Sequence, residues 1–436
     1  MTDQNPQQQN SAASDRIVAT YWLETALPIE RVVEVIAGEQ SSGTFVAVPG
    51  ETPELKQRHG ARVENITLLD TADTPSLIGS RTPKNTEAIR YQRAEVVISF
   101  PFENVGANLP TLVATVCGNL YELSDHSGLR LLDIDIPATF AEVYPAPQFG
   151  IEGTRRLTGV YDRPIIGTIV KPSVGLSPQQ TAELVRELSE ADIDFVKDDE
   201  LMADSPHSPL KERVSAVMKV IHEHAERTGK RIMFAFNITD EIDNMKRHHD
   251  TVLEAGGTCV MVSLNSMGYP AVSALRKHSQ LPIHGHRNGW GMYTRCPALG
   301  IAFTAYQKFW RLAGVDHLHV NGLQNKYWEP DESVVKSIHA CQKPMLGGYA
   351  VMPVLSSGQW AGQAPETYRR AGTVDLMYLA GGGIMAHPSG RSAGVTAIRQ
   401  AWEAAVQGVP LEEYAKERRE LHEAIEKYGG LRSGGG

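Results

Sequence analysis

From about residue 163 onwards, short apolar runs alternate with longer amphipathic stretches, and the alternation repeats about eight times. Apolar runs of this length are typical of strands that are buried on both faces of a parallel sheet. Strands alternating with helices at this spacing predict βα units, and eight units predict a closed (β/α)8 TIM barrel, an α/β fold. The predicted strands span residues 165–170, 194–196, 231–236, 259–262, 282–283 (the start of the fifth), 317–320, 345–351 and 376–379.

The stretches between these strands predict helices with their own start and stop signals. Ser177 followed by Pro178 is typical of an N-cap and a first-turn proline, for a helix that ends near Ala191. Gly229 predicts the end of the next helix. The remaining predicted helices span residues 209–228, 240–256, 297–313 and 393–408, with a charged amphipathic helix over 411–428.

The first part of the chain lacks the βα repeat. Strands are predicted over 18–23 and 95–100 and a helix over 28–38, and residues 111–117 form a further apolar, β-branched run. We therefore predict an N-terminal α+β domain before the barrel. The expected organisation is a disordered tail over 1–15, the α+β domain over 16–145, the barrel with its C-terminal helix over 146–428, and a flexible tail over 429–436.

Composition excludes several classes of protein. A net charge of −9 and a pI near 5.9 argue against nucleic acid as a partner. No apolar run approaches the roughly 20 residues that span a bilayer, so we expect no membrane partner. The four cysteines, which form no Cys-x-x-Cys pair, indicate buried thiols in a reducing cytoplasm: Cys117, Cys259, Cys296 and Cys341.

Polar, titratable or glycine-rich residues follow seven of the eight predicted strands. In such barrels the active site lies at the C-terminal mouth, where these residues meet. Any one of them could be structural, but the set predicts a catalytic site. In strand order the residues are Lys171; Lys197, Asp198, Asp199 and Glu200; Asn237; His284, His286 and Arg287; His317, His319 and, after a loop, Lys326; Ser356, Ser357 and Gly358; and Gly381, Gly382, Gly383 and His387.

The residue types indicate the chemistry of this site. A run of three carboxylates and one amine, 197–200, suits Mg²⁺, although an isolated charged turn is more often solvated. Lys171 beside such a metal could polarise a carbonyl or move a proton. The glycine-rich exit at 381–383 predicts a phosphate cradle, and Arg287, His319 and Ser356, with Gly358, predict a second anion site. Together they suit proton abstraction α to a ketone, with the metal stabilising an enediolate of a phosphorylated keto-sugar or keto-sugar acid.

These motifs resemble the large subunit of ribulose-bisphosphate carboxylase (RuBisCO) over about residues 20–425. Residues 167–177, Gly-Thr-Ile-Val-Lys-Pro-Ser-Val-Gly-Leu-Ser, resemble its first catalytic-lysine segment, and residues 194–200 resemble its metal-site segment. The resemblance implies that Lys197 is carbamylated and that Asp199 and Glu200 join it as Mg²⁺ ligands. It also implies catalytic roles for His286 and for Lys326, the mobile-loop lysine.

The same resemblance assigns the substrate contacts and an oligomer. It implies substrate and phosphate contacts by Arg287, His319, Ser356, Gly381 and Gly382. Glu39, Thr44 and Asn119 match residues that the family donates to the site of the partner subunit. We therefore expect a homodimer or a higher homo-oligomer with shared active sites.

Departures from the carboxylase pattern indicate the subtype. Ser173 stands where the carboxylases have the second lysine of Lys-Pro-Lys, Phe45 replaces a tryptophan, Trp290 a histidine and Ser357 a glycine. A neutral Ser173 changes the field around an enediolate, which disfavours CO₂ fixation. Phe45 and Trp290 would reshape the phosphate ends, which suggests a substrate with one phosphate. The chain is thus similar to the RuBisCO-like (type IV) proteins, and with its metal and proton-transfer residues retained it is expected to be an active enzyme.

Within that group, the expected reaction is decarboxylation, or transcarboxylation and hydrolysis, of 3-oxo-isoapionate 4-phosphate in apiose catabolism. The alternative is an enolase or isomerase of a methylthio-ketose phosphate in methionine salvage. A catalytically silent interaction protein would be expected to have lost the metal residues, which are intact here. A barrel aldolase with a Schiff-base lysine at Lys171 or Lys197 is disfavoured by the adjacent carboxylates.

Overall fold

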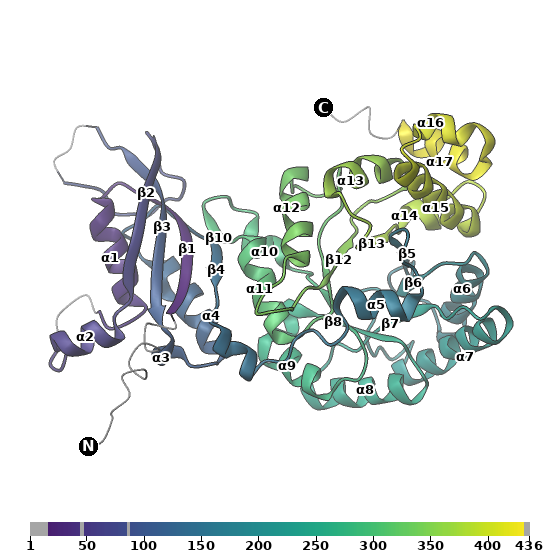
Figure 1. Ribbon diagram of the computed structural model, residues 1–436, viewed down its shortest axis with the longest axis horizontal. Helices are drawn as coiled ribbons and strands as arrows, with labels where there is room; N and C mark the ends of the chain where they lie inside the picture. The colour runs from purple at the N-terminus through teal and green to yellow at the C-terminus, as the bar shows by residue number, and fades with distance from the viewer. Residues whose placement is uncertain (1–15, 44–47, 85–87, 431–436) are drawn as a thin grey trace, which may run out of the picture. The chain divides into compact units, whose positions relative to one another are not determined.

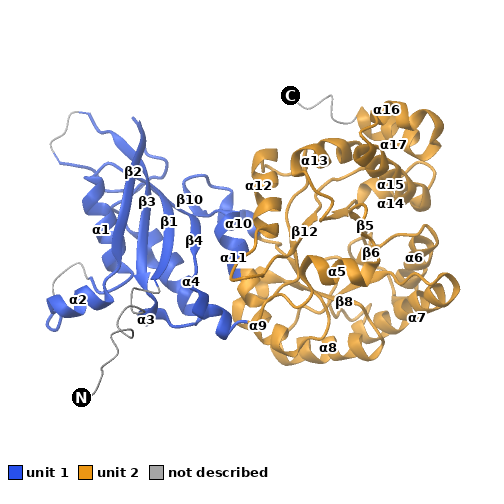
Figure 2. Cartoon of the chain, viewed as in Figure 1, with its two compact units in different colours: residues 1–144, 290–309 blue, residues 145–289, 310–436 orange. Residues whose placement is uncertain are grey.

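The computed structural model describes residues 16–43, 48–84 and 88–430. The chain divides into two compact units, coloured separately in Figure 2. Unit 1 contains residues up to 144 together with residues 290–309, and unit 2 contains residues 145–289 and 310 onwards. The segment 290–309 therefore leaves the barrel sequence to join the N-terminal unit.

Unit 1 is built on a five-stranded sheet in the order β10-β4-β1-β3-β2. The strands are β1 (Arg16–Thr25), β2 (Arg62–Ala72), β3 (Tyr91–Pro101), β4 (Gly128–Asp135) and β10 (Leu299–Ile301). Alternate residues of β1 are buried, as expected for a strand with one face on a core. The helices of this unit are α1 (Ile29–Glu39), α2 (Pro53–His59), α3 (Phe102–Val105), α4 (Leu109–Cys117) and α10 (Trp290–Thr294), with the 3₁₀ turns η1 (Asn119–Glu122) and η2 (Ala138–Glu142).

Unit 2 is the predicted (β/α)8 barrel, closed in the strand order β11-β12-β13-β5-β6-β7-β8-β9. Its strands, all paired in parallel, are β5 (Ile165–Ile169), β6 (Phe195–Lys197), β7 (Met233–Asn237), β8 (Cys259–Ser263), β9 (Ile283–His286), β11 (His317–His319), β12 (Met352–Leu355) and β13 (Met377–Leu379).

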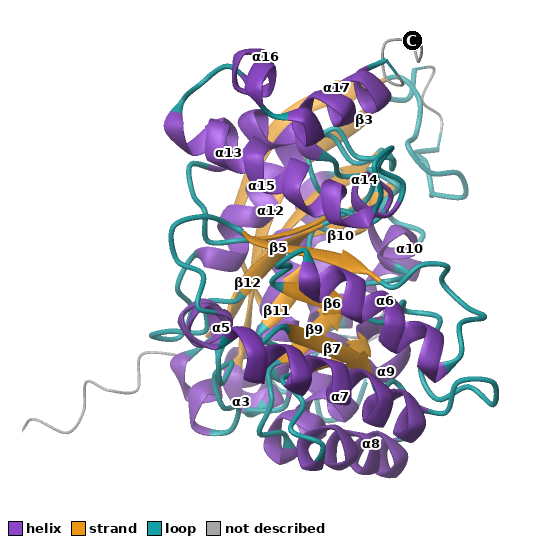
Figure 3. Cartoon of the chain, turned by 90° about the vertical axis from the view of Figure 1, so that its right-hand side faces the viewer, coloured by secondary structure: helices purple, strands orange, loops and turns teal. Residues whose placement is uncertain are grey.

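Helices surround this strand ring, and Figure 3 shows α6, α7 and α8 side by side along its outside. They are α5 (Gly150–Thr158), α6 (Pro178–Glu190), α7 (Leu210–Thr228), α8 (Ile242–Glu254), α9 (Leu264–His278), α12 (Asp331–Gln342), η3 (Ala361–Gln363), α13 (Ala364–Ala371), α14 (Gly382–Met385), α15 (Arg391–Gln407), α16 (Leu411–Tyr414), η4 (Ala415–Glu417) and α17 (Arg419–Gly429). Helix α11 (Phe303–Ala313) begins in unit 1 and ends in unit 2, and the colours of Figure 1 follow the chain from its N-terminus to its C-terminus. Ser177 forms the predicted N-cap of α6, and Gly229 ends α7 in the left-handed conformation.

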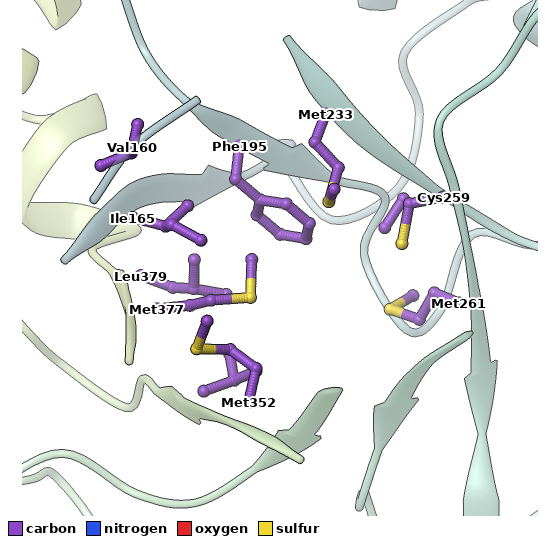
Figure 4. Close-up of a cluster of buried hydrophobic side chains, with 11 residues drawn as sticks. Val160, Ile165, Phe195, Met233, Cys259, Met261, Met352, Met377 and Leu379 are labelled. Atoms are coloured by element: carbon purple, nitrogen blue, oxygen red, sulfur yellow. The ribbon is translucent and has the colours of Figure 1, made fainter. Parts of the chain in front are cut away.

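A cluster of apolar side chains from the strands fills the inside of the barrel (Figure 4). Its members include Phe195, whose ring lies in the middle of the cluster, and the methionines Met233, Met261, Met352 and Met377. Gly167 makes room for this ring, because a Cβ there would lie 2.9 Å from Phe195 Cδ1 and 2.5 Å from Leu379 Cδ2. The barrel is thus a packed core that supports the polar strand ends.

The apolar, β-branched run 111–117, to which the sequence analysis assigned no element, lies in helix α4, which Asn108 caps. Three sequence predictions of local structure are wrong. Residues 345–351 form a turn with an isolated bridge, and the seventh barrel strand is β12, which follows it. The helix predicted over 297–313 is interrupted because 299–301 pair with β4, and the helix predicted over 411–428 is broken into α16, η4 and α17.

The structure bears on two predictions made from composition, one on membrane spans and one on the cysteines. None of the helices in the described parts of the chain has the length and apolar character needed to cross a bilayer. All four cysteines lie in described residues and none forms a disulfide. Cys259 and Cys341 are buried as predicted, but Cys117 is half-buried and Cys296 is exposed.

Asp194, the residue before β6, is buried and anchors the barrel through its ion pairs. Its carboxylate accepts hydrogen bonds from Arg163 (2.5 and 3.1 Å), Lys230 (2.9 Å) and the backbone N–H of Ile166 (2.9 Å). Although burial favours the protonated form, the Arg163 guanidinium and the Lys230 ammonium hold the pKa of Asp194 below its ordinary value. The carboxylate is therefore ionised in the folded protein at neutral pH.

We expect Asp194→Asn to lower the free energy of unfolding by about 3 kcal/mol at pH 7, since it removes one partner of a buried ion pair. The folded-state pKa lies below the unfolded value of about 3.9, so this stabilisation is complete above about pH 4 and is lost as the pH falls through the folded-state pKa. Urea unfolding of both proteins from pH 7 to pH 3 measures the difference. A difference that stays constant over that range would contradict the assignment.

Candidate active site

The adjacent strands β5 and β6 bring two lysines and two carboxylates to one place. Lys171 lies two residues beyond the end of β5, and Lys197 is the last residue of β6. The two strands are paired, with Ile169 of β5 opposite Lys197 of β6. Lys171 Nζ donates to Asp199 Oδ2 at 2.7 Å and to Ser173 Oγ at 2.8 Å. Lys197 Nζ lies 3.5 Å from Glu200 Oε2. The predicted metal and proton-transfer residues are thus assembled at the carboxyl ends of these strands.

His286, at the end of β9, joins the same group. Its Nε2 lies 3.5 Å from Glu200 Oε2, and its Nδ1 is 3.2 Å from Asn288 Oδ1. Burial and the nearby Lys197 lower the pKa of His286 to about 4. Burial opposes ionisation of Glu200, but His286 and Lys197 lower its pKa to about 2. The pair therefore consists of a neutral imidazole beside a carboxylate at neutral pH.

Lys197 itself is almost completely buried. Its side chain is 1% exposed, and its Nζ also donates to the backbone carbonyl of Asp198 at 2.9 Å. Burial lowers the pKa of Lys197, while Glu200 and Asp199 act in the opposite direction. A lowered pKa increases the fraction of uncharged amine, which is the nucleophilic form of a lysine.

Asp198 points away from this group and is structural. Its Oδ2 accepts from Arg213 Nη2 at 3.2 Å and from the backbone N–H of Asn237 at 3.0 Å. Burial raises the pKa of Asp198, and Arg213 acts against that rise. In a continuous strand, side chains alternate between two faces, so Asp198 and Glu200 would both lie opposite Lys197. Because β6 ends at Lys197, Glu200 is free to turn back to the lysine.

A second group of polar residues lies at the ends of β9, β11 and β12. His319 Nδ1 lies 3.2 Å from Ser356 Oγ, and His319 Nε2 lies 2.7 Å from His284 Nε2. Burial, with the neighbouring His286 and His284, holds the pKa of His319 well below its ordinary value. His319 is therefore uncharged, so it adds no positive charge to the second anion site that the sequence predicted.

Arg287, the third member of that predicted anion site, is engaged by a carboxylate. Its Nη2 lies 3.2 Å from Glu329 Oε2, which also accepts from Asn321 Nδ2 at 2.5 Å. Asn321 Oδ1 in turn accepts from Ser357 Oγ at 2.8 Å. Sequence reasoning missed Glu329 and Asn321, and the only available signal was an acidic residue three positions after Lys326.

The loop residues around these groups are placed as follows. Lys326 is exposed, and its ammonium lies 5.3 Å from the Tyr327 ring centroid. Ser357 has φ +76°, in the left-handed region that favours glycine, where the carboxylases have one. Gly358 follows with φ +85°, and the backbone N–H of Lys326 donates to the Ser357 carbonyl at 3.1 Å. The two loops that follow β11 and β12 are therefore joined.

The glycines after β13 begin helix α14. Gly381 precedes it and Gly382 is its first residue, where an added Cβ would meet open space. Gly383 is needed for packing, since a Cβ there would lie 2.6 Å from the carbonyl oxygen of Gln359. His387 is structural: it is buried and its Nε2 lies 2.9 Å from the Glu420 carbonyl.

In unit 1, Glu39 ends α1 and Asn119 begins η1, and both side chains are exposed. Thr44 and Phe45 lie outside the described residues. The roles of Glu39, Thr44 and Asn119 in a partner's site stay predictions.

The fold and the strand-end residues match one family over nearly the whole chain. Residues 150–428 match the catalytic domain of the ribulose bisphosphate carboxylase large chain, and residues 6–140 match its N-terminal domain. The chain therefore belongs to the ribulose bisphosphate carboxylase large-chain family.

Two similar proteins are named as enzymes of 3-oxo-isoapionate 4-phosphate and not as CO₂-fixing carboxylases. The 3-oxo-isoapionate-4-phosphate transcarboxylase/hydrolase of Xanthobacter autotrophicus is 53% identical over 94% of this chain and 99% of its own length. The 3-oxo-isoapionate-4-phosphate decarboxylase of Rhizobium etli is 50% identical over 94% of this chain and 98% of its own.

Solved structures of a RuBisCO-like protein and of a RuBisCO share this fold. A RuBisCO-like protein from Burkholderia fungorum superposes with a TM-score of 0.88 at 47% identity, covering 95% of this chain and 100% of that one. A dimeric archaeal RuBisCO from Hyperthermus butylicus has a TM-score of 0.81 at 29% identity, covering 95% and 96%. The predicted family and fold are confirmed.

Proposed function

We propose that this protein is a Mg²⁺-dependent RuBisCO-like enzyme that acts on a phosphorylated keto-sugar acid through an enediolate. Its reaction would be decarboxylation, or transcarboxylation and hydrolysis, of 3-oxo-isoapionate 4-phosphate in apiose catabolism. The observation that carries this proposal is the cluster of Lys171, Lys197, Asp199 and Glu200 at the ends of two adjacent strands. One relative named for each of these two activities shares about half of its residues with this chain over nearly its full length.

The residues of this cluster fit Mg²⁺. Asp199 and Glu200 offer carboxylate oxygens, which are the hard ligands that Mg²⁺ prefers. Each carboxylate lies beside a lysine ammonium, which shows that the position between them favours a positive charge. Among the described residues they belong to neither of the two clusters of three potential metal-binding side chains, which are His249, Asp250 and His278, and Asp204, Asp240 and His248. A carbamate on Lys197 would supply a third oxygen. Bound there, Mg²⁺ would stabilise negative charge that develops on the substrate.

The chain's own residues would orient the substrate and move protons. Loss of CO₂ from a β-keto acid breaks a carbon–carbon bond and leaves the electron pair on the enediolate, which then needs a proton at carbon. Lys171 Nζ is held between Asp199 and Ser173, with its side chain 41% exposed, and so can deliver that proton. Neutral Ser173, in place of the carboxylase lysine, leaves Lys171 as the cation of this segment.

We also propose a cytoplasmic homodimer or higher homo-oligomer with shared active sites. Exposed Glu39 and Asn119 support it, since the family's matching residues serve the partner subunit. The domains are proposed to be the α+β domain over 16–145 and the barrel with its C-terminal helix over 146–428, between tails over 1–15 and 429–436. Residues 290–309 lie within the second range but belong to unit 1.

The deciding experiment is ³¹P NMR of the purified protein with Mg²⁺ and bicarbonate. In parallel it is offered 3-oxo-isoapionate 4-phosphate, a methylthioribulose phosphate and ribulose bisphosphate. We expect turnover of the first alone, and its product distinguishes decarboxylation from transcarboxylation and hydrolysis. Turnover of the methylthio sugar would replace the proposal with methionine salvage, and silence on all three would favour the non-catalytic alternative.

A further inference from the structure

Three buried histidines form one hydrogen-bonded chain between helix α5 and the mouth of the barrel. The strands β9 and β11 pair side by side and carry them, and each is less than 5% exposed. The successive contacts are Thr154 Oγ1 to His317 Nε2 (2.8 Å), His317 Nδ1 to His284 Nδ1 (3.3 Å), His284 Nε2 to His319 Nε2 (2.7 Å) and His319 Nδ1 to Ser356 Oγ (3.2 Å).

Each ring in this chain is neutral. Burial lowers the pKa of His317 to about 3, and it holds the pKa of His284 and of His319 well below the ordinary value. Lys197, His286 and Arg287, which surround the outer two rings, act in the same direction. A neutral imidazole has one donor and one acceptor nitrogen, so the state of one ring decides the state of the next.

Thr154, at the inner end of this row of hydrogen bonds, determines which atom donates in each of them. The Thr154 hydroxyl donates its one proton to the carbonyl of Gly150, four residues earlier in α5. Thr154 Oγ1 must therefore accept from His317 Nε2–H. His317 Nδ1 then accepts from His284 Nδ1–H, and His284 Nε2 accepts from His319 Nε2–H. The outermost nitrogen, His319 Nδ1, therefore accepts from the Ser356 hydroxyl, and the Ser356 oxygen, with its one proton committed, is left as an acceptor.

We infer that Thr154, acting through His317 and His284, fixes His319 as its Nε2–H tautomer, which commits the Ser356 proton to His319 and so presents the Ser356 oxygen as an acceptor at the barrel mouth. Thr154 is a positioning residue, remote from the substrate. The acceptor has a consequence for the substrate, which rests on the proposed function. A phosphate dianion offers only acceptors, whereas a hydroxyl offers a donor. With Arg287 also engaged by Glu329, this end of the site takes a hydroxyl of a singly phosphorylated sugar acid and not a second phosphate.

The tautomer is tested by long-range ¹H–¹⁵N NMR of the full-length protein labelled at histidine, with His319→Asn identifying the signals of that ring. We expect an unprotonated Nδ1 and a protonated Nε2 on His319. Thr154→Val keeps the shape of the side chain but removes the acceptor, and should shift His319 towards its Nδ1–H form. Thr154→Ser should restore the wild-type signals.

Thr158→Val is the matched control. Thr158 is buried one turn further along α5, and its hydroxyl donates to the backbone carbonyls of Thr154 and Arg155, so its removal should leave His319 unchanged. Unchanged His319 signals in Thr154→Val, or a proton on Nδ1 in the wild type, would overturn the inference. Because no substrate is involved, this readout stands even if the proposed function fails.

The consequence for the substrate has its own readouts. If 3-oxo-isoapionate 4-phosphate is turned over, Thr154→Val should raise its KM about tenfold by mismatching one hydrogen bond, with recovery in Thr154→Ser. An unchanged KM would overturn the hydroxyl assignment. Protonation of both His319 nitrogens on addition of inorganic phosphate would overturn it as well, since the ring would then be serving an anion.

Discussion

Lys197→Ala and Asp199→Ala should each abolish Mg²⁺-dependent turnover, with a loss of about a thousandfold or more in kcat/KM. Lys197 provides the amine that a carbamate would need, and Asp199 provides an oxygen ligand and holds Lys171 Nζ at 2.7 Å. Neither loss can be replaced by water, because both side chains are at most 2% exposed. Steady-state kinetics with varied Mg²⁺ measure the effect.

A matched control is Lys211→Ala, which removes an exposed lysine of helix α7 and should leave kinetics unchanged. Thermal unfolding of each variant separates loss of chemistry from loss of fold. Full activity of Lys197→Ala or of Asp199→Ala in a folded protein would rule out the metal-site assignment.

Asp198→Ala, one residue away, should instead lower the free energy of unfolding by about 3–5 kcal/mol, because it leaves the buried Arg213 guanidinium without its carboxylate. Both side chains are only 1% exposed, and Arg213 also donates to the Ser208 and Ala203 carbonyls, which hold the loop after β6. Urea unfolding at pH 7 measures the change.

The double variant Asp198→Ala/Arg213→Leu tests the cause of that effect. Removing both charges should recover part of the lost free energy of unfolding, since no unpaired ion then remains in the core. An unfolding free energy for Asp198→Ala that equals the wild-type value would show that the pair is unimportant. Two adjacent aspartates should thus separate into one that governs stability and one that governs chemistry.

The barrel could be predicted from sequence because apolar runs and helix caps carry local signals that the tertiary structure reinforces. Ser177 with Pro178, and Gly229, define helix ends by their own backbone chemistry. The run 111–117 could not be assigned from its residue types alone, since β-branched residues also pack on a helix when Asn108 caps it and the tertiary contacts favour it. Strand β10 could not be predicted from local sequence, because the strand that it pairs with, β4, lies some 170 residues earlier in the chain.

The candidate site was predictable to a similar degree. The placement of Lys171, Lys197 and Asp199 follows from the rule that strand ends meet at the mouth of a barrel. Which lysine pairs with which carboxylate could not be predicted by that rule, since it depends on how the chain turns after β6. Glu329, Asn321 and Thr154 could not be found, because their partners lie on other strands and loops and no spacing along the chain reveals them.

Strand β10 limits how the protein can be divided into modules. The edge strand of the N-terminal sheet, β10, comes from residues 299–301 and pairs in parallel with β4. Arg130 of β4 donates hydrogen bonds to the carbonyls of Thr294 and Cys296, which precede β10. A fragment cut after residue 145 would leave β4 as an open edge with unpaired backbone groups, a template for aggregation. The two units are therefore interleaved along the gene, and no single cut or recombination crossover separates them intact.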